Sequence, residues 1–509
     1  MEPPVAFPFP GSSNNCGALP NQRGATPRPP CYPQLMVTEL TPPTPSPTGP
    51  DGSRPALPVA VLGAGITGLT TAWHLHQQGV PVLVFDAATV AGGVIQSHRE
   101  DGWLRETGPN TLFENSAEIT TFIEGLGLGP RRLDAAPSAQ KRYVVRAGQP
   151  VALPASPLQF VTTPLLSLGT KLSLLGEPFR SRAPADADES VAEFVKRRLG
   201  REFLDYIVNP FVAGVYAGAP EGLSVRHAFP KLHTLEQQHG SMIRGSLARR
   251  NASGGPRGRM ISFPEGLAEI PRALATALGD RVRLGHRVDA VRRTATGWTI
   301  AVSANGTRSD VPVASIVSTL PPEALARLPF EGVPGADGRA LLQTITQPPV
   351  ATVFLGFRRE DVAHPLDGFG LLNPAVEKRR ILGTLFSSTL FPHRAPAGHV
   401  ALTTFVGGTR QPHFALLDDD ALLATVQEEL GALLGVHGAP VYARIQRWPR
   451  AIPQYAVGYQ KFKDACTALE RAAPGFFVGG TTRDGVSLAN CITAGRRLSE
   501  VVRQHLSLP

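Results

Sequence analysis

The feature that most constrains this chain is a glycine-rich turn, Gly-Ala-Gly-Ile-Thr-Gly, at residues 63–68. The apolar run at residues 59–62 precedes the turn and is typical of a buried parallel strand. Residues 69–78 then read as a helix, and a second apolar run at residues 82–85 closes on Asp86, about 20 residues after the glycines. This order of strand, turn, helix, strand and acid predicts a Rossmann-type unit that binds a dinucleotide.

Each position of this turn has an expected physical role. Gly63 permits the tight bend, Gly65 lets the backbone approach a pyrophosphate, and Gly68 lets helix and strand pack closely. The helix N-terminus offers N–H donors and a partial positive charge to phosphate groups. Asp86 is expected to accept hydrogen bonds from the adenosine ribose. The predicted cofactor contacts at the turn are Gly63, Ala64, Gly65, Ile66, Thr67 and Gly68.

Further glycine-rich segments favour FAD over NAD. Gly92 and Gly93 follow the Asp86 strand, where a second close backbone approach to a pyrophosphate is expected. The tight turn that comes next adds predicted contacts at Thr107, Gly108, Pro109 and Asn110. Residues 475–480 read as a second buried strand ending on glycines, and a helix follows. A cofactor as long as FAD needs this second strand-turn-helix, in which residues 484–488 lead into the helix.

Composition and charge narrow the classes of partner. The net charge of +9 suits anionic substrates, acidic membranes or nucleic acid, and equally a solvated, arginine-rich surface. No basic tract is interleaved with aromatic residues, which are only 7% of the chain, so we expect no nucleic-acid partner. The four cysteines form no zinc-like cluster, which predicts no metal site and a reducing compartment. His227, His233 and His239 match no ligand spacing and are expected on a solvated loop.

The first 57 residues differ from the rest of the chain. They are crowded with Pro, Gly, Ser and Thr, which cannot bury enough apolar surface to offset the entropy of ordering. We therefore predict a disordered arm at residues 1–57. It lacks the pattern of a secretory signal or a mitochondrial transit peptide. A later start at Met36 and a proline-rich ligand for a partner domain both stay open.

Residues 137–225 have a pattern of apolar and basic residues that suits helices with an apolar face and a basic fringe. The apolar members include Leu158, Val161, Leu168, Leu172 and Leu174. Inward packing and contact with a membrane surface are both compatible with this pattern. No run of about 18 apolar residues exists, so we expect no membrane-spanning helix. Downstream, residues 281–284, 299–302 and 315–317 read as strands, and the last helix is expected to begin near Ile492.

Longer motifs in the middle of the chain carry a resemblance to a known family. They are residues 141–148, 209–218, 364–370, 382–388 and 403–408. The glycine-rich segments resemble the flavin monoamine oxidase superfamily. The middle motifs resemble, within it, the oxygen-dependent protoporphyrinogen oxidases of the plant mitochondrial type. The resemblance covers residues 58–509.

This resemblance implies an α/β fold in which a Rossmann-type FAD-binding domain is discontinuous. It places that domain at residues 58–136, 226–310 and 449–509. A helical membrane and substrate-channel subdomain is implied at residues 137–225, and a mixed-sheet substrate-binding domain at residues 311–448. A peripheral membrane surface is implied as well. We expect a cytoplasmic protein, with attachment to the inner face of the cytoplasmic membrane and a homodimer both left open.

The implied chemistry is FAD-dependent oxidation of protoporphyrinogen IX to protoporphyrin IX, with O2 as acceptor and H2O2 as product, in heme biosynthesis. Arg142 would pair with a substrate propionate, in a wide apolar pocket of the kind such a macrocycle needs. The other implied substrate contacts are Gly214, Leu372, Leu385 and Phe405. Val288 and Trp448 are implied FAD contacts, and Val486, Ser487 and Leu488 are implied to close the site. The flavin performs the hydride abstraction, so no catalytic side chain is assigned.

Several alternatives stay open. Related flavoproteins often place an Asp after the final glycine strand, but this chain has Gly479, Gly480 and Thr481 there, which leaves the ribityl contact undecided. A coproporphyrinogen III oxidase would need extra cations in its cavity, for which Arg146, Arg379 and Arg380 are candidates. An FAD amine oxidase would need an aromatic cage, formally available from Trp448, Tyr455 and Tyr459. A carotenoid desaturase and a non-catalytic nucleotide-binding module complete the alternatives.

Overall fold

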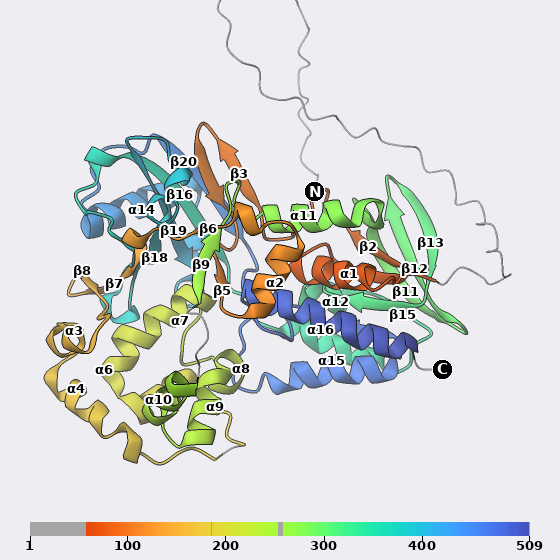
Figure 1. Ribbon diagram of the computed structural model, residues 1–509, viewed down its shortest axis with the longest axis horizontal. Helices are drawn as coiled ribbons and strands as arrows, with labels where there is room; N and C mark the ends of the chain where they lie inside the picture. The colour runs from red at the N-terminus through yellow and green to blue at the C-terminus, as the bar shows by residue number, and fades with distance from the viewer. Residues whose placement is uncertain (1–56, 185, 253–257, 508–509) are drawn as a thin grey trace, which may run out of the picture. The chain divides into compact units, whose positions relative to one another are not determined.

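The computed structural model describes residues 57–184, 186–252 and 258–507, which Figure 1 shows as a ribbon. The arm predicted at residues 1–57 lies outside these described residues, apart from Leu57. Parallel and antiparallel sheets alternate with many helices, which confirms the predicted α/β class. Within the described ranges, no helix is long and apolar enough to cross a bilayer.

A parallel five-stranded sheet is built from distant parts of the chain. Its strands, in spatial order, are β10 (Val282–Leu284), β2 (Val82–Asp86), β1 (Val59–Leu62), β14 (Ser315–Ser318) and β21 (Phe476–Val478). One face is covered by α1 (Ile66–Gln77), α11 (Glu269–Leu278) and α16 (Leu488–Ser507) (Figure 1). The other face packs against α12 (Pro322–Arg327) and α15 (Gln460–Ala472). The apolar run of β1 is continuous because both of its faces are buried.

The predicted Rossmann elements are confirmed, with one shift. Strands form at the predicted positions of β1, β2, β14 and β21, although β21 is shorter than predicted. Helix α16 begins at Leu488 rather than near Ile492. The hydroxyl of Ser487 accepts a hydrogen bond from the N–H of Asn490 at 3.1 Å, as an N-cap residue does, so the helix starts one turn earlier.

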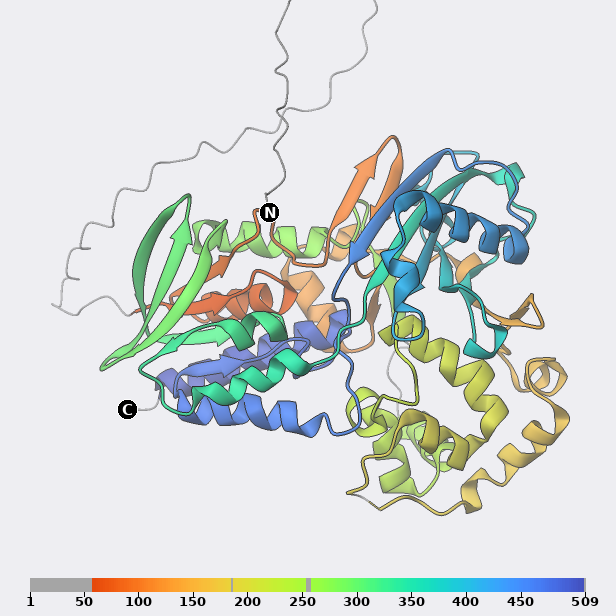
Figure 2. The same cartoon turned by 180° about the vertical axis from the view of Figure 1, so that it is seen from behind.

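A second, seven-stranded sheet forms the other large β element. Its strands, in spatial order, are β20 (Tyr442–Trp448), β16 (Val350–Arg358), β19 (His399–Gly407), β18 (Ile381–Phe386), β17 (Gly368–Leu372), β7 (Lys141–Arg146) and β8 (Gln149–Ala152). Helix α14 (Asp419–Leu434) covers one face, as Figure 2 shows from behind. Alternate residues of each strand, such as Val353 and Leu355 of β16, form the core beneath α14.

The helical region begins and ends later than predicted. Residues 137–225 were expected to be helical, but they begin with β7 and β8, which join the seven-stranded sheet. The alternation of Tyr143 and Val145 toward the α14 core has the period of a strand. The helices that follow are α3 (Pro157–Thr162), α4 (Leu168–Leu175), α5 (Val191–Leu199), α6 (Arg201–Phe203), α7 (Asn209–Tyr216), α8 (Val225–Ala228), α9 (Pro230–His239) and α10 (Met242–Ala252).

Two further expectations need correction. The histidines expected on a solvated loop lie on α8 and α9, and His227 is buried. The strand β14 belongs to the parallel sheet, so the seven-stranded sheet takes nothing from residues 311–349. In both cases the non-local packing of the segment decided its environment, which local composition does not report.

Smaller sheets complete the fold. They are β3 (Ser97–Glu100) with β4 (Trp103–Glu106); β5 (Leu112–Glu114) with β9 (Arg259–Ser262) and β6 (Leu133–Asp134); and β13 (Thr307–Val313) with β12 (Gly297–Ala304), β11 (Arg287–Thr294) and β15 (Phe330–Glu331). Helix α2 (Ala117–Gly125) lies between β5 and β6 in sequence, and α13 (Ser387–Leu390) lies between β18 and β19.

Candidate functional site

The N-terminus of α1 forms an open cradle at the carboxyl end of β1. A Cβ placed on Gly68 would lie 2.0 Å from the carbonyl oxygen of Gly63, so helix and turn meet without room for a side chain. A Cβ on Gly65, in contrast, would have no protein atom within 4 Å. No side chain caps the helix and no acid lies in its first turn. Free N–H donors beside open space fit an anionic group such as a pyrophosphate.

Asp86 lies against this turn. Its carboxylate accepts hydrogen bonds from the N–H of Ala64 at 2.7 Å and of Ala88 at 2.8 Å. The predicted ribose acceptor therefore also holds the glycine turn in place, and lone pairs remain for a ligand. Val288 is brought close through its strand β11, because the N–H of His286 bonds the carbonyl of Asp86 at 2.8 Å.

The other predicted glycine segments surround the same cradle. The N–H of Gly92 donates to the carbonyl of Ala64 at 2.8 Å, and a Cβ on Gly93 would lie 3.5 Å from the Cα of Gly65. At the far end of the chain, a Cβ on Gly480 would lie 3.9 Å from the hydroxyl oxygen of Thr67. Backbone from three separate predicted segments thus converges on the α1 N-terminus.

Thr319 is a cradle residue that the glycine motif does not include. It follows β14, and its hydroxyl donates to the carbonyls of Leu62 at 3.1 Å and Gly63 at 3.3 Å. A polar residue just after a buried apolar strand is a recognisable signal, because the carboxyl ends of parallel strands meet at one edge of the sheet.

The turn at Thr107–Asn110 connects the cradle to the seven-stranded sheet. A Cβ on Gly108 would lie 2.1 Å from the carbonyl oxygen of Val94, so glycine is required there. The indole N–H of Trp448, at the end of β20, donates to the carbonyl oxygen of Thr107 at 2.9 Å. Trp448 and this turn, both predicted cofactor contacts, are therefore in direct contact with each other.

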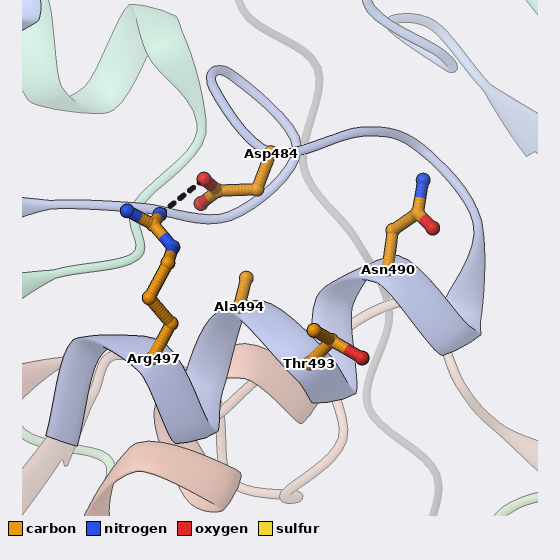
Figure 3. Close-up of a pocket in the computed structure, with 5 residues that line it drawn as sticks. All are labelled: Asp484, Asn490, Thr493, Ala494 and Arg497. Atoms are coloured by element: carbon orange, nitrogen blue, oxygen red, sulfur yellow. Dashed lines mark hydrogen bonds and ion pairs between the residues drawn. The ribbon is translucent and has the colours of Figure 1, made fainter. Parts of the chain in front are cut away.

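Asp484 lies against the glycine end of β21, where Gly479, Gly480 and Thr481 stand in place of a strand-end acid. The N–H of Gly480 donates to the carboxylate of Asp484 at 2.8 Å, and Asp484 pairs with Arg497 on α16. Burial raises the pKa of Asp484, while Arg497 opposes that change. Figure 3 shows both residues at a small surface hollow of about 170 Å³, lined also by Asn490, Thr493 and Ala494. That volume is below the usual range for pockets that bury a drug-sized ligand, so the hollow is not the main site.

The predicted substrate residues share one face of the seven-stranded sheet. Gly370 pairs with Arg142 on one side and with Leu385 on the other. Two residues further along β17, Leu372 pairs with Gly383, which pairs with Phe405. Residues in register, or two apart on one strand, point to the same face. Arg142, Leu372, Leu385 and Phe405 therefore all lie on the face opposite α14.

The same face reaches the turn at Thr107–Asn110. Phe405 pairs with Thr352, and Thr352 pairs with Gln446, two residues before Trp448. Leu372, Leu385, Phe405 and Trp448 are each only half-buried, unlike the core beneath α14. A Cβ on Gly214 would lie 3.0 Å from Cδ2 of Leu372, which places α7 over this face. The result is a partly apolar surface, covered by α7, that leads from Arg142 to the cradle.

The sequence pattern of the family described as flavin containing amine oxidoreductase matches residues 66–503. The chain belongs to this family. It is 34% identical over 480 residues to protoporphyrinogen oxidase 2, chloroplastic/mitochondrial, of Arabidopsis thaliana, across 88% of this chain and 94% of that protein. The mitochondrial protoporphyrinogen oxidase of Nicotiana tabacum is also 34% identical, across 90% and 97% of the two chains. The coproporphyrinogen III oxidase of Staphylococcus aureus is 29% identical, across 87% and 98%.

Solved structures share the fold of this flavin containing amine oxidoreductase. A crystal structure from Exiguobacterium has a TM-score of 0.75 at 22% identity, covering 89% of this chain and all of that one. Cyclohexylamine oxidase from Brevibacterium oxydans has a TM-score of 0.65 at 17% identity, covering 89% and 100%. The protein is thus a flavin-dependent oxidoreductase with FAD as its cofactor, and the open α1 cradle fits that group.

The arginines considered for extra carboxylates are occupied in this flavin oxidoreductase. Arg146 pairs with Glu202 at 2.8 Å and also bonds the carbonyl of Leu165. Arg379 and Arg380 pair with Glu429 at 3.6 and 3.1 Å, on the α14 side of the sheet. Arg142 is exposed, lies 5.3 Å from the ring of Phe369, and forms no ion pair with any described residue.

The tyrosines considered for an aromatic cage are structural. Tyr455 and Tyr459 are buried, and their ring centroids lie 4.4 Å apart. The Tyr455 hydroxyl donates to the carbonyl of Thr481 at 2.7 Å and accepts from the N–H of Gly485 at 2.8 Å. Burial raises the pKa of both phenols. They hold the loop that leads into α16 and present no open ring faces to a substrate.

Proposed function

We propose that this protein oxidises protoporphyrinogen IX to protoporphyrin IX, with O2 as acceptor and H2O2 as product, in heme biosynthesis. One observation carries the proposal: a single sheet face joins Arg142, through Leu372, Leu385 and Phe405, to Trp448 at the cofactor turn. Such a face suits a flexible, largely apolar macrocycle with anionic propionates. The names of the plant relatives support the same substrate.

The FAD contacts that we propose follow the cradle. The N–H donors at the start of α1 would bind the pyrophosphate, because those of Gly63 and Ala64 already bond Phe85 and Asp86. The backbone of Gly92 and Gly93 would approach the same group, and Asp86 would take the adenosine ribose. The turn at Thr107–Asn110, with Trp448, would lie beside the redox-active ring system. Val486, Ser487 and Leu488 at the start of α16 would close the other side, and Val288 would contact the adenosine end.

Bound FAD supplies a two-electron acceptor that O2 regenerates, and three such cycles convert the porphyrinogen to the porphyrin. The protein residues bind, orient and shield the macrocycle. Arg142 would hold a propionate through bidentate hydrogen bonds, while Leu372, Leu385 and Phe405 would exclude water from the ring. Pyrrole N–H protons can pass to solvent, so we assign no general base.

The small number of free arginines on this face favours protoporphyrinogen, which carries fewer carboxylates than coproporphyrinogen. Coproporphyrinogen carries two more propionates and needs more cations along the cavity face. Arg146, Arg379 and Arg380 are each paired with a glutamate. Of the two arginines on β7, Arg142 is the one that forms no ion pair with any described residue. The Staphylococcus aureus relative keeps coproporphyrinogen III oxidation as the second candidate.

The helical region suits a peripheral membrane surface. Large apolar side chains are exposed along α3, α4 and the turn after them, namely Leu158, Val161, Leu168, Leu172, Leu175 and Phe179. Phe179 is 84% exposed, and exposed apolar clusters of this kind mark interaction surfaces. We propose that this surface rests on the inner face of the cytoplasmic membrane and opens the cavity to a membrane-dissolved substrate. A homodimer stays a prediction.

A direct assay tests the proposed activity. The purified protein is offered protoporphyrinogen IX and coproporphyrinogen III in air, while the flavin spectrum and porphyrin fluorescence are followed. We expect flavin-containing protein and rapid protoporphyrin formation, with slower turnover of coproporphyrinogen. Free FAD at the same concentration serves as the control for autoxidation. Fluorescence no faster than that control with either substrate would rule the proposal out.

A further inference from the structure

We propose that Arg410 is a positioning residue that sets the gap between α7 and the substrate face of the seven-stranded sheet. This inference rests on the proposed function, because it concerns the cavity in which the porphyrinogen would bind. It concerns a residue that no sequence motif singled out.

The Arg410 guanidinium bridges two elements. Nη1 donates to the carbonyl oxygen of Asn373, just after β17, at 2.8 Å. Nη2 donates to the carbonyl oxygen of Asn209 at 3.0 Å and to its side-chain Oδ1 at 2.8 Å, at the start of α7. Asn209 Oδ1 also accepts the N–H of Ala375 at 2.8 Å. These bonds, the Arg410 bridge, tie the start of α7 to the end of β17.

The same loop also holds the other end of α7. The N–H of Thr409 donates to the carbonyl oxygen of Ala217 at 2.8 Å, just past the last residue of the helix. A widened, π-helical turn at Leu204–Val208 precedes α7. Pro210 has no N–H to continue the regular ladder, which accounts for that turn. Both ends of α7 are therefore fixed by two consecutive residues of one loop.

The bridge uses the shape of arginine rather than an ion pair. Its acceptors are all neutral carbonyl oxygens, and no carboxylate of a described residue lies within ion-pair distance. Burial lowers the pKa of Arg410 to about 10, and the charge of Glu221 opposes the effect. A planar guanidinium can reach these acceptors at once, whereas an ammonium is a compact point charge.

The consequence for the cavity follows from a neighbouring contact. Leu372 directly precedes Asn373, and a Cβ on Gly214 of α7 would lie 3.0 Å from Cδ2 of Leu372. That distance is shorter than an ordinary van der Waals contact, so there is no room for even a methyl group between α7 and β17 at this point. Because the bridge joins the same two elements, it determines how closely α7 covers the substrate face.

A double-mutant cycle between Arg410 and Gly214 tests the inference. We expect Arg410→Gln to raise KM for protoporphyrinogen roughly 10-fold while kcat stays within about two-fold and FAD occupancy is unchanged. Gly214→Ala should also raise KM, because its Cβ pushes against Leu372. In the Arg410→Gln background α7 can move away from β17. The KM increase caused by Gly214→Ala should therefore be at least about three-fold smaller there than in the wild-type protein.

Three further measurements separate positioning from other roles. Arg410→Lys should not restore KM, because one ammonium cannot reach both Asn209 and Asn373. Asn209→Ala, which removes only the side-chain acceptor, should give a smaller KM rise of the same kind. Amide hydrogen exchange across residues 209–217 should be faster in Arg410→Gln. Arg339→Gln is the matched control, since Arg339 also bonds backbone carbonyls, of Leu328 and Ala336, away from the cavity.

The outcomes are distinct. Independent, multiplicative KM effects, full rescue by Arg410→Lys, or unchanged exchange in α7 would each overturn the positioning role. If the wild-type protein oxidises neither porphyrinogen, the proposed function fails instead. Hydrogen exchange in α7 then still decides whether the Arg410 bridge holds the helix, because that measurement needs no substrate.

Discussion

Arg394 and Glu106 form a buried ion pair between the seven-stranded sheet and the cofactor turn, with Nη2 3.3 Å from Oε1. Arg394 lies between β18 and β19, and its Nη2 also donates to the carbonyl oxygen of Asn110 at 2.8 Å. Glu106 ends β4 directly before the turn at Thr107–Asn110 and accepts the N–H of Leu267 at 2.9 Å. Together with the bond from Trp448 to Thr107, this pair holds the seven-stranded sheet against the turn.

Removing one partner of this pair should destabilise the protein. Glu106→Gln leaves the buried guanidinium of Arg394 without its counter-charge, at a cost of about 3–5 kcal/mol in the free energy of unfolding. The measurement is the denaturant midpoint of the flavin-free protein. Glu265→Gln, in the solvent-exposed pair with Arg99, is the control and should change the midpoint far less. Equal shifts in the two variants would show that burial of the pair does not matter.

Gly65 and Gly68 should fail in different ways when replaced by alanine. Gly65→Ala places its Cβ in open space, so the apoprotein should lose about 1 kcal/mol or less, while FAD binding falls. Gly68→Ala forces a contact with the Gly63 carbonyl and should cost the apoprotein about 1–3 kcal/mol more. Flavin absorbance per mole of protein and urea unfolding of the apoprotein report the two effects. Full FAD occupancy in Gly65→Ala would refute the cradle assignment.

Arg142→Ala should weaken substrate binding without affecting the cofactor. Loss of a charge-assisted bidentate contact predicts a KM increase of roughly 10- to 100-fold, with FAD occupancy unchanged. Arg142→Lys keeps the positive charge but loses the two parallel N–H donors of the guanidinium, so its KM should lie between those of the wild type and Arg142→Ala. The control is Lys141→Ala. Lys141 is the cation next to Arg142 in sequence, but it is paired with Asp367, so its removal should barely alter KM. Loss of FAD in Arg142→Ala would show that the propionate role is misassigned.

The exposed apolar surface of α4 and the following turn should mediate vesicle binding. Burial of each large apolar side chain contributes about 1.5–3 kcal/mol, so Leu172→Ser combined with Phe179→Ser should lower vesicle affinity roughly 100-fold or more. Cosedimentation with anionic phospholipid vesicles measures the change. Leu416→Ser is the matched control, because Leu416 is 67% exposed on a different part of the molecule. A similar loss of binding in both would contradict a specific membrane surface.

Acid should loosen the helical region through Glu202. Burial alone would raise its pKa, but hydrogen bonds from Thr170 and Ser167 and the Arg146 pair lower it to about 2 from an ordinary value of 4.5. A carboxyl group whose pKa is lowered by folding stabilises the folded state at any pH above its pKa in the unfolded chain. This stabilisation is lost as the pH falls from 4.5 toward 2. Circular dichroism across that range should show a smaller pH dependence in Glu202→Gln. Glu428→Gln, at a 70% exposed carboxylate, should follow the wild type.

Elements whose pattern lies within a short stretch of sequence could be predicted. Elements whose place depends on pairing with residues far away in the sequence could not. The turn at residues 63–68 was identified because its glycines, strand and helix are adjacent in sequence. In contrast, local composition predicts that β7 belongs to a helical region, because its place in the seven-stranded sheet depends on pairing with β17, more than 200 residues away. His227 was expected in solvent for the same reason. The bridging roles of Arg394 and Arg410 have no local signal at all, since their partners lie on remote elements.

By itself the sequence determined the dinucleotide cradle, the need for a second strand-turn-helix at the C-terminal end, and the family resemblance. These depend on spacing between near neighbours, where backbone geometry follows directly from glycine and apolar runs. The three-dimensional fold was needed to show that Arg142, Leu385 and Phe405 share a face with Trp448, and that Arg146, Arg379 and Arg380 are paired with carboxylates. The physical reason is that a strand alternates its side chains between two faces. Which face carries a given side chain depends on the register with strands from distant parts of the chain.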